Sequence, residues 1–150
     1  MAQTTSASSA CDVKVELDDS TGALIDISGM SNSMSMGLTN NISGGTYTFG
    51  SECPLRFECG QDSTISANIL YSTTADEGFD ILKDWYFGVT GGARSIRISV
   101  PDATTNSDQY DVEVYLAEMT WDMTAGDPEP IMVAVTFTPT GCMLHTMIGS

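Results

Sequence analysis

Few residues in this sequence could carry catalytic chemistry near neutral pH. The only histidine, His145, lies in a C-terminal stretch without clear hydrophobic periodicity. A catalytic base must be held within hydrogen-bonding reach of its substrate by the surrounding structure, so we interpret His145 as a surface imidazole. The nucleophile-elbow pattern G-x-S-x-G, the P-loop and the dinucleotide-binding pattern G-x-G-x-x-G are all absent from the sequence. These residues predict no enzyme active site.

The sequence contains cysteine and histidine residues that could bind a metal ion, but their spacing does not favour a metal site. Two residues separate Cys142 from His145, and Cys53 and Cys59 could complete a tetrahedral zinc site. Structural zinc sites usually hold their cysteines in tight knuckles, whereas five residues separate Cys53 from Cys59. The acidic segment 18–22 lacks the ligand spacing and the terminal glutamate of a calcium loop. We therefore expect buried, inert thiols and no metal or other cofactor.

Acidic residues are so abundant that a pair of carboxylates carries little information. Twenty Asp and Glu side chains could supply the two carboxyl groups of a glycoside hydrolase at a suitable distance. Trp85 and Trp121 could stack on a sugar, but Trp85 lies on the apolar face of a predicted helix and is expected in the core. Trp121, beside Met119 and Met123, fits either role. A β-sandwich hydrolase is therefore an alternative that no motif supports.

Length, charge and hydropathy exclude several classes of function. The 150 residues are enough for one domain with a substantial core. Five basic and twenty acidic side chains give a net charge of −15, which repels phosphate backbones and excludes tight nucleic-acid binding. The longest purely apolar run, 131–135, is too short to span a bilayer, so we expect no membrane interaction.

Alternation of apolar and polar side chains with period two is the dominant pattern along the chain. At its start Val13, Val15 and Leu17 alternate with charged residues, which is typical of a strand with one buried face. Gly, Asn, Asp and Pro between the alternating segments supply turn chemistry. We predict seven or eight strands, from the extended segments 12–18, 23–27, 30–38, 55–57, 64–71, 96–100, 110–119 and 131–137 and from the strand-like part, 46–49, of a long loop.

One segment changes to a helical period. Thr74 and Glu77 have the spacing of a capping box, and acidic residues fill the first turns, where the helix dipole favours them. Phe79, Leu82 and Tyr86 recur at helical spacing and predict the face that packs on the core. We predict a single helix over residues 75–87.

Together these elements predict a mainly β protein: a two-sheet β-sandwich or open barrel with one flanking α-helix. We expect a flexible N-terminal arm at 1–11, a single domain at 12–141 with a long loop at 39–54, and a C-terminal tail at 142–150. An open sandwich leaves strand edges with unpaired backbone groups, and five basic residues are too few to protect them. Pairing between identical copies would cover these edges.

The order and spacing of these elements resemble those of the tail tube protein, or major tail protein, of bacteriophages with long, non-contractile tails. The resemblance covers residues 12–141. Its most specific part is the stretch 69–87, a strand followed by the capped helix, and the segments 96–102, 110–117 and 133–141 follow in order. The resemblance implies a β-sandwich with a flanking helix, of which six copies close a ring whose inner sheets form one continuous barrel. It also implies that the rings stack into a tube in the virion tail, assembled in the cytoplasm of a host bacterium.

The resemblance further implies partners and interface residues. The partners are other copies of the chain and the tape measure, tail terminator and tail tip proteins. The 39–54 loop and the N-terminal arm would reach neighbouring subunits or rings. The interface candidates in this loop are Asn40, Asn41, Gly44 and Gly45. Arg94 and Arg97 either pair with acidic residues of an adjacent subunit or lie solvated at a strand end.

Charge sign matters for DNA that passes through such a tube. Six copies with a net charge of −15 each carry −90 per ring, and acidic groups in the bore would repel the DNA and let it slide. A cationic lining would hold the DNA through counterion release. Asp111 and Glu113 are lumen-lining candidates because they are the most acidic pair on a predicted strand. The alternative self-assembling function is that of a capsid decoration protein, which is also all-β and not catalytic.

Overall fold

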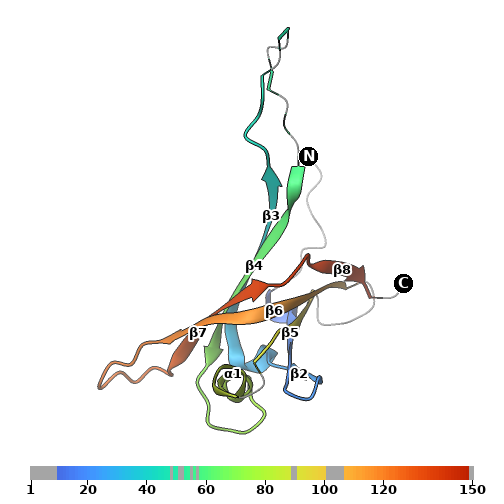
Figure 1. Cartoon of the computed structure of the whole chain (residues 1–150). Helices are drawn as coiled ribbons and strands as arrows, with labels where there is room; N and C mark the ends of the chain where they lie inside the picture. The colour runs from blue at the N-terminus through green and yellow to red at the C-terminus, as the bar shows by residue number, and fades with distance from the viewer. Residues whose placement is uncertain are drawn as a thin grey trace, which may run out of the picture.

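Eight antiparallel strands form one sheet that bends around an apolar core (Figure 1). The computed structural model describes residues 10–47, 49–50, 53–54, 56, 58–88, 91–100 and 107–148. Its elements are two short 3-10 helices, Ala10–Asp12 and Ser28–Met30, the helix α1 (Gly78–Phe87), and the strands β1 (Lys14–Asp18), β2 (Leu24–Asp26), β3 (Ser31–Ile42), β4 (Glu58–Leu70), β5 (Arg94–Val100), β6 (Asp108–Trp121), β7 (Met132–Pro139) and β8 (Leu144–Met147). The strand order is β2-β1-β5-β6-β7-β4-β3, and β8 pairs with β6 outside this path.

Strand β6 joins two halves of the sheet. Its first part, residues 108–114, pairs with β5, and its second part, residues 114–121, pairs with β7. The register with β7 shifts between Leu116 and Glu118, and a bulge of this kind bends the strand that carries it. We call β3, β4, β7 and the second part of β6 the four-strand sheet. We call β2, β1, β5, β8 and the first part of β6 the β5 half.

The apolar side chains of both halves and of α1 make up the core. Trp85 is buried, its Nε1 donates a 2.8 Å hydrogen bond to the Gly92 carbonyl oxygen, and its ring stacks on Phe137. Trp121 is partly buried and meets the ring of Phe79 edge-on, so both tryptophans belong to the core. The buried strand residues follow the predicted alternation; they are Val15, Leu17, Ile65, Ala67, Ile69, Ile96, Ile98, Val112, Val114, Val133, Val135 and Phe137.

The helix begins later than its sequence pattern predicts. α1 starts at Gly78 instead of residue 75, and its N-cap residue, Glu77, makes no side-chain capping bond. The predicted capping box is therefore wrong. Asp76 has a φ of 63°, in the left-handed region, which interrupts the helical conformation before Gly78. The backbone N–H of Asp76 instead donates to the Asp80 carboxylate, at 3.2 Å.

The buried face of the helix differs from the predicted one at a single residue. Phe79 and Leu82 are buried as predicted, but Tyr86 is 57% exposed, so its assignment to the core face is wrong. In the last turn of the helix, Trp85 and not Tyr86 packs on the core. The spacing from Gly78 through Leu82 to Trp85 follows the 3.6-residue period, and Tyr86 lies about 100° further round the helix axis.

Strands β3 and β4 form a long hairpin that extends beyond the rest of the fold (Figure 1). β4 pairs with β3 along nearly its whole length but with β7 only over residues 65–70. The strands predicted at 30–38 and 64–71 are therefore too short, and the loop predicted to begin at residue 39 begins as a paired strand. Pairing between the two strands overrides the turn preference of the Asn and Gly residues there.

Other predicted segments also differ in the structure. In the segment predicted as strand-like at 46–49, Thr46 forms only an isolated bridge. Most of the strand predicted at 55–57 lies outside the described residues. Residues 1–9 of the predicted arm also lie outside them. The predicted C-terminal tail contains a strand, β8, which pairs with the start of β6. Within the part of the chain that the structure describes, α1 is too short to cross a membrane.

Candidate self-association surface

The outer edge of the four-strand sheet is the strand β3. Among the described residues β3 pairs only with β4, so its second edge presents unpaired backbone groups along twelve residues. Natural edge strands usually carry charged residues or proline, which prevent pairing with another chain. The stretch 27–51 contains neither, in a chain with a net charge of −15. β3 is therefore an edge that is open to another strand.

A second open edge lies on the opposite side of the same sheet. The pairing between β5 and β6 ends at Val114. Along residues 115–121, no strand in the described part of the chain pairs with this edge of β6. The other edge of β6 residues 115–121 pairs with β7. The four-strand sheet thus ends in two different open strands, and each could pair with the other in a second molecule.

The face of the four-strand sheet that points away from the core is polar and lacks basic residues. Register places its side chains in rows across the strands, and Asn68 donates a 2.9 Å hydrogen bond to Ser33 within one row. Glu118 lies in the next row and accepts a 3.0 Å hydrogen bond from Thr120. The two rows consist of Ser33, Asn68, Ala134 and Thr120, and of Ser35, Ser66, Thr136 and Glu118.

All five basic residues lie elsewhere. Lys14 on β1 pairs with Glu16 at 2.9 Å, and Lys83 on α1 pairs with Asp80 at 2.5 Å. The hydrogen bond from Lys83 holds the pKa of the Asp80 carboxyl below its ordinary value. The remaining three are Arg56, between β3 and β4, and Arg94 and Arg97 on β5.

The two lumen candidates, Asp111 and Glu113, lie on the first part of β6. One oxygen of Asp111 accepts a 2.7 Å hydrogen bond from Arg97 Nε, and the other accepts one of 2.6 Å from Gln109. The guanidinium therefore compensates the charge of Asp111. Glu113 is exposed, and Thr140 at the end of β7 donates to its backbone carbonyl. Because of the bulge, Glu113 shares the outward face of β6 with Glu118.

Neither arginine candidate is a solvated strand end. Arg97 is paired within the chain, as described above. Arg94 is only 7% exposed, and its guanidinium lies 5.1 Å from the centre of the Trp85 ring. One of its nitrogens lies 3.5 Å from the Asp18 carbonyl oxygen. Both side chains are held by intramolecular contacts in the free chain, which sequence reasoning missed because their partners are distant in sequence.

The four loop candidates lie at the far end of the β3–β4 hairpin. Asn40 and Asn41 are exposed strand residues opposite Gln61 and Gly60. Gly44 and Gly45 follow, and Gly45 has a φ of 87°, which favours glycine. Large apolar side chains are exposed on the same hairpin, namely Leu38, Ile42, Tyr47 and Phe49. An exposed apolar group of this size is characteristic of a protein interface.

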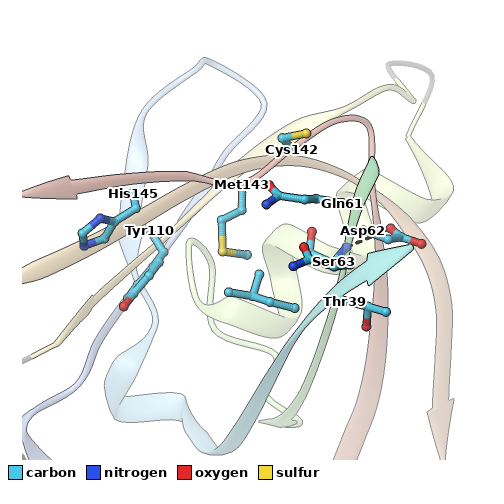
Figure 2. A pocket seen from close by; sticks show the side chains of 10 residues that line it. Thr39, Gln61, Asp62, Ser63, Tyr110, Cys142, Met143 and His145 are labelled. Atoms are coloured by element: carbon cyan, nitrogen blue, oxygen red, sulfur yellow. Dashed lines mark hydrogen bonds between the residues drawn. The ribbon is translucent and has the colours of Figure 1, made fainter. Parts of the chain in front are cut away.

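A cavity of about 330 Å³ lies between the β3–β4 hairpin and the segment that contains β8, and Asn40 is one of the residues that line it (Figure 2). His145 lines it and is exposed, with Nε2 2.8 Å from the Asp108 carboxylate. No group of three metal-ligating side chains exists among the described residues. Cys11, Cys53 and Cys142 are exposed, so the prediction of buried thiols is wrong for these three.

Comparison by sequence finds no matching protein-family model and no matching curated protein. Comparison by structure does find matches. A chain of the SPP1 tail tube superposes with a TM-score of 0.75 at 10% identity, covering 96% of this chain and 81% of that one. This chain has the tail-tube fold. The predicted resemblance and the predicted fold class, mainly β with one helix, are thereby confirmed.

Two further assemblies contain chains of the same fold. One is the tail of an empty gene transfer agent particle with C6 symmetry, with a TM-score of 0.70 at 12% identity, covering 93% of this chain and 99% of that one. The other is the PVC sheath–tube complex of an extracellular contractile injection system, with a TM-score of 0.66 at 14% identity, covering 96% and 94%. The shared tail-tube fold thus persists where sequence identity is very low.

Proposed function

We propose that this chain is a structural subunit of a tail tube, in which six copies close a ring and the rings stack. The observation that carries the proposal is the pair of open edges on the four-strand sheet, of which β3 is free of charge. Two different open edges on one molecule fit a head-to-tail ring, because a twofold dimer would pair like with like. The C6 symmetry of the gene transfer agent tail supports the number six.

In this proposal the role is structural and not catalytic, and the protein acts in the virion tail after assembly in the bacterial host. Its partners are other copies of itself and the tape measure, tail terminator and tail tip proteins. The arm at 1–11 and the exposed loop between β3 and β4 contact neighbouring copies. The apolar side chains on the hairpin supply buried area for these contacts.

The outward face of the four-strand sheet would line the bore. Its other face is covered by the chain's own core, so in a ring closed through β3 and β6 only the polar face is left for the interior. That face has no basic side chain among its described residues; Glu118 gives it negative charge, and Glu113 adds to it from the same face of the first part of β6. A polar, anionic wall binds a DNA backbone weakly and allows it to slide. Asp111 contributes less because Arg97 neutralises it.

Electron microscopy of variants with added charge on strand β3 tests whether rings form by pairing at this edge. Ser33→Lys combined with Ser35→Lys adds two cations to the open edge strand β3, which should abolish pairing between copies. The matched control is Ser66→Lys combined with Ala134→Lys, which adds the same charge to the same face on the interior strands β4 and β7. We expect tubes from the native chain and the control, and only folded monomers from the β3 variant.

The outcomes of this experiment separate the alternatives. Tubes from the β3 variant as abundant as those from the native chain would reject the edge-pairing ring. Isolated trimers from the native chain, without stacked rings, would favour a capsid decoration protein instead. Circular dichroism of each variant verifies that a loss of tubes does not result from unfolding.

A further inference from the structure

Large apolar side chains face the core at both open edges of the four-strand sheet, where the chain covers them only in part. Register places two rows of core-facing side chains across the four strands. The rows consist of Met34, Ala67, Val135 and Met119, and of Met36, Ile65, Phe137 and Leu116. The two inner residues of each row are buried, whereas the residues on β3 and β6 at the row ends are partly exposed. Each row therefore ends on both sides in an apolar group that could be covered further.

Strand direction determines which row ends would meet in a ring. The strands β6, β7, β4 and β3 alternate in direction, since each neighbouring pair is antiparallel. Rotation about a ring axis preserves the direction of every strand, so β3 of one copy would run antiparallel to β6 of the next. Side chains alternate between the two faces of a sheet, so a register that buries both cores brings core-facing residues of the two strands together. Met34 and Met36 would then lie against Leu116 or Met119.

We propose that Met34 and Met36 of one copy pack against Met119 of the next in an apolar seam, and that oxidation of these three seam methionines prevents the ring from closing. The proposal rests on the tube proposed above, which brings β3 and β6 of different copies together. A hollow of about 470 Å³ lies beside the start of β3 and is lined by Val13, Val15 and Met34 among others. It offers room for an apolar side chain of the next copy. Methionine suits such a seam because its unbranched, polarizable side chain fills irregular gaps.

Oxidation converts the apolar seam into a polar one. A peroxide transfers one oxygen atom to the methionine sulfur: the S–O bond forms as the O–O bond breaks, the thioether becomes a sulfoxide, and hydrogen peroxide is reduced to water. Sulfoxide groups in an apolar interface lack hydrogen-bond partners, which disfavours pairing of the two edges. Methionine sulfoxide reductases reverse the change. The seam methionines are partly exposed in the free chain and open to a peroxide, whereas the next copy covers them in a closed ring.

Peroxide treatment before assembly tests the effect of oxidation. The native chain, treated with hydrogen peroxide as the free chain, should form no tubes, and methionine sulfoxide reductases should restore them. The variant with Met34→Leu, Met36→Leu and Met119→Leu keeps similar apolar volume without sulfur and should form tubes with or without peroxide. Its four cysteines are unchanged, so it also controls for thiol oxidation. The matched control, Met123→Leu with Met147→Leu, removes two exposed methionines outside the seam and should stay sensitive to peroxide.

Mass spectrometry of the native chain tests the contact itself and needs no variant. After brief peroxide treatment, the three seam methionines should be oxidised several-fold more slowly in assembled tubes than in the free chain, because access to the sulfur governs the rate. Met123 and Met147 are 68% and 62% exposed, and they provide the reference for open access in the free chain. Protection in the tube therefore locates the residues that the next copy covers.

Several outcomes would overturn the proposal. The seam methionines could react equally in the free chain and in tubes, which would show that no copy covers them. The oxidised native chain could form tubes, or the oxidised leucine variant could lose them, which would place the sensitive group elsewhere. Protection of Met34 already in the free chain would show that the chain itself covers the edge of β3. In all these cases the tube stands, whereas an untreated native chain without tubes contradicts the proposed function first.

Discussion

The two halves of the sheet carry their charge in different ways. In the β5 half, basic residues meet acidic ones within the chain, as Lys14 does with Glu16 and Arg97 with Asp111. In the four-strand sheet the outward face is made of Ser, Thr, Asn and Ala with few acids, and the outer edges of β3 and of the second part of β6 have no partner among the described residues. The β5 half pairs these basic residues within the chain, whereas the four-strand sheet carries a polar face without basic residues and two long edges that are open among the described residues. This difference is the reason that we propose the four-strand sheet as the surface that associates with other copies.

The largest expected effect comes from shortening the hairpin of the four-strand sheet. Deleting Asn40 to Gly45 removes the end of β3 and part of the exposed loop, but no buried core residue. We expect a monomer with nearly native melting temperature that forms no tubes. Electron microscopy and thermal unfolding measure the two properties. Replacing the same six residues with a Gly/Ser sequence of equal length is the control for chain length, and normal tubes from the deletion would contradict the assigned interface.

The second prediction reverses the charge of the outward face. Glu113→Lys combined with Glu118→Lys changes the charge by four per copy, and phosphate binding by the new cations should slow genome ejection about tenfold or more while tubes still form. Asp111→Asn combined with Arg97→Gln is the control, because it removes a neutral pair. The measurement is the rate of DNA release from virions with the variant tube. An unchanged rate for the Glu variant would show that these residues do not line the bore.

The third prediction concerns the ion pair of the β5 half. Arg97 and Asp111 are 35% and 28% exposed, so solvent screens their attraction. A double-mutant cycle with alanine at both positions should give a coupling free energy of about 0.2–1 kcal/mol, which decreases with salt. Chemical denaturation of the monomer measures it. A coupling of zero would weaken the view that this half is satisfied by its own ion pairs.

The smallest effect is expected at the turn between β1 and β2. Hydrogen bonds from the backbone of Ala23 and from the hydroxyl and backbone of Thr21 lower the pKa of the Asp19 carboxyl. A lowered pKa in the folded state stabilises the fold above the ordinary Asp value, and this stabilisation disappears as pH falls through the folded pKa. Asp19→Asn should therefore reduce the melting temperature slightly at pH 7 but not near pH 2. Thermal unfolding across this pH range is the measurement, and a pH-independent difference would argue against the carboxylate as the cause.

Much of the β5 half could be predicted from sequence because its signals are local. Alternating residues such as Val15 and Leu17 showed both the strand and its buried face. The helix was found, but its first turn was not, since the left-handed backbone of Asp76 overrides the apparent capping box. Strand β8 was missed because its four residues are all exposed and show no alternation of burial. Only its pairing with β6 defines it as a strand.

The sequence by itself determined the class of fold, the strongly acidic character of the protein and the absence of the nucleophile-elbow, P-loop and dinucleotide-binding patterns. These follow from composition and from patterns within a few residues. The tertiary structure decided which edges are open, that Arg97 neutralises Asp111, and that the bulge in β6 places Glu118 on the same face as Glu113. Such features depend on pairing between segments far apart in the chain, and a local pattern does not specify the partner of a strand.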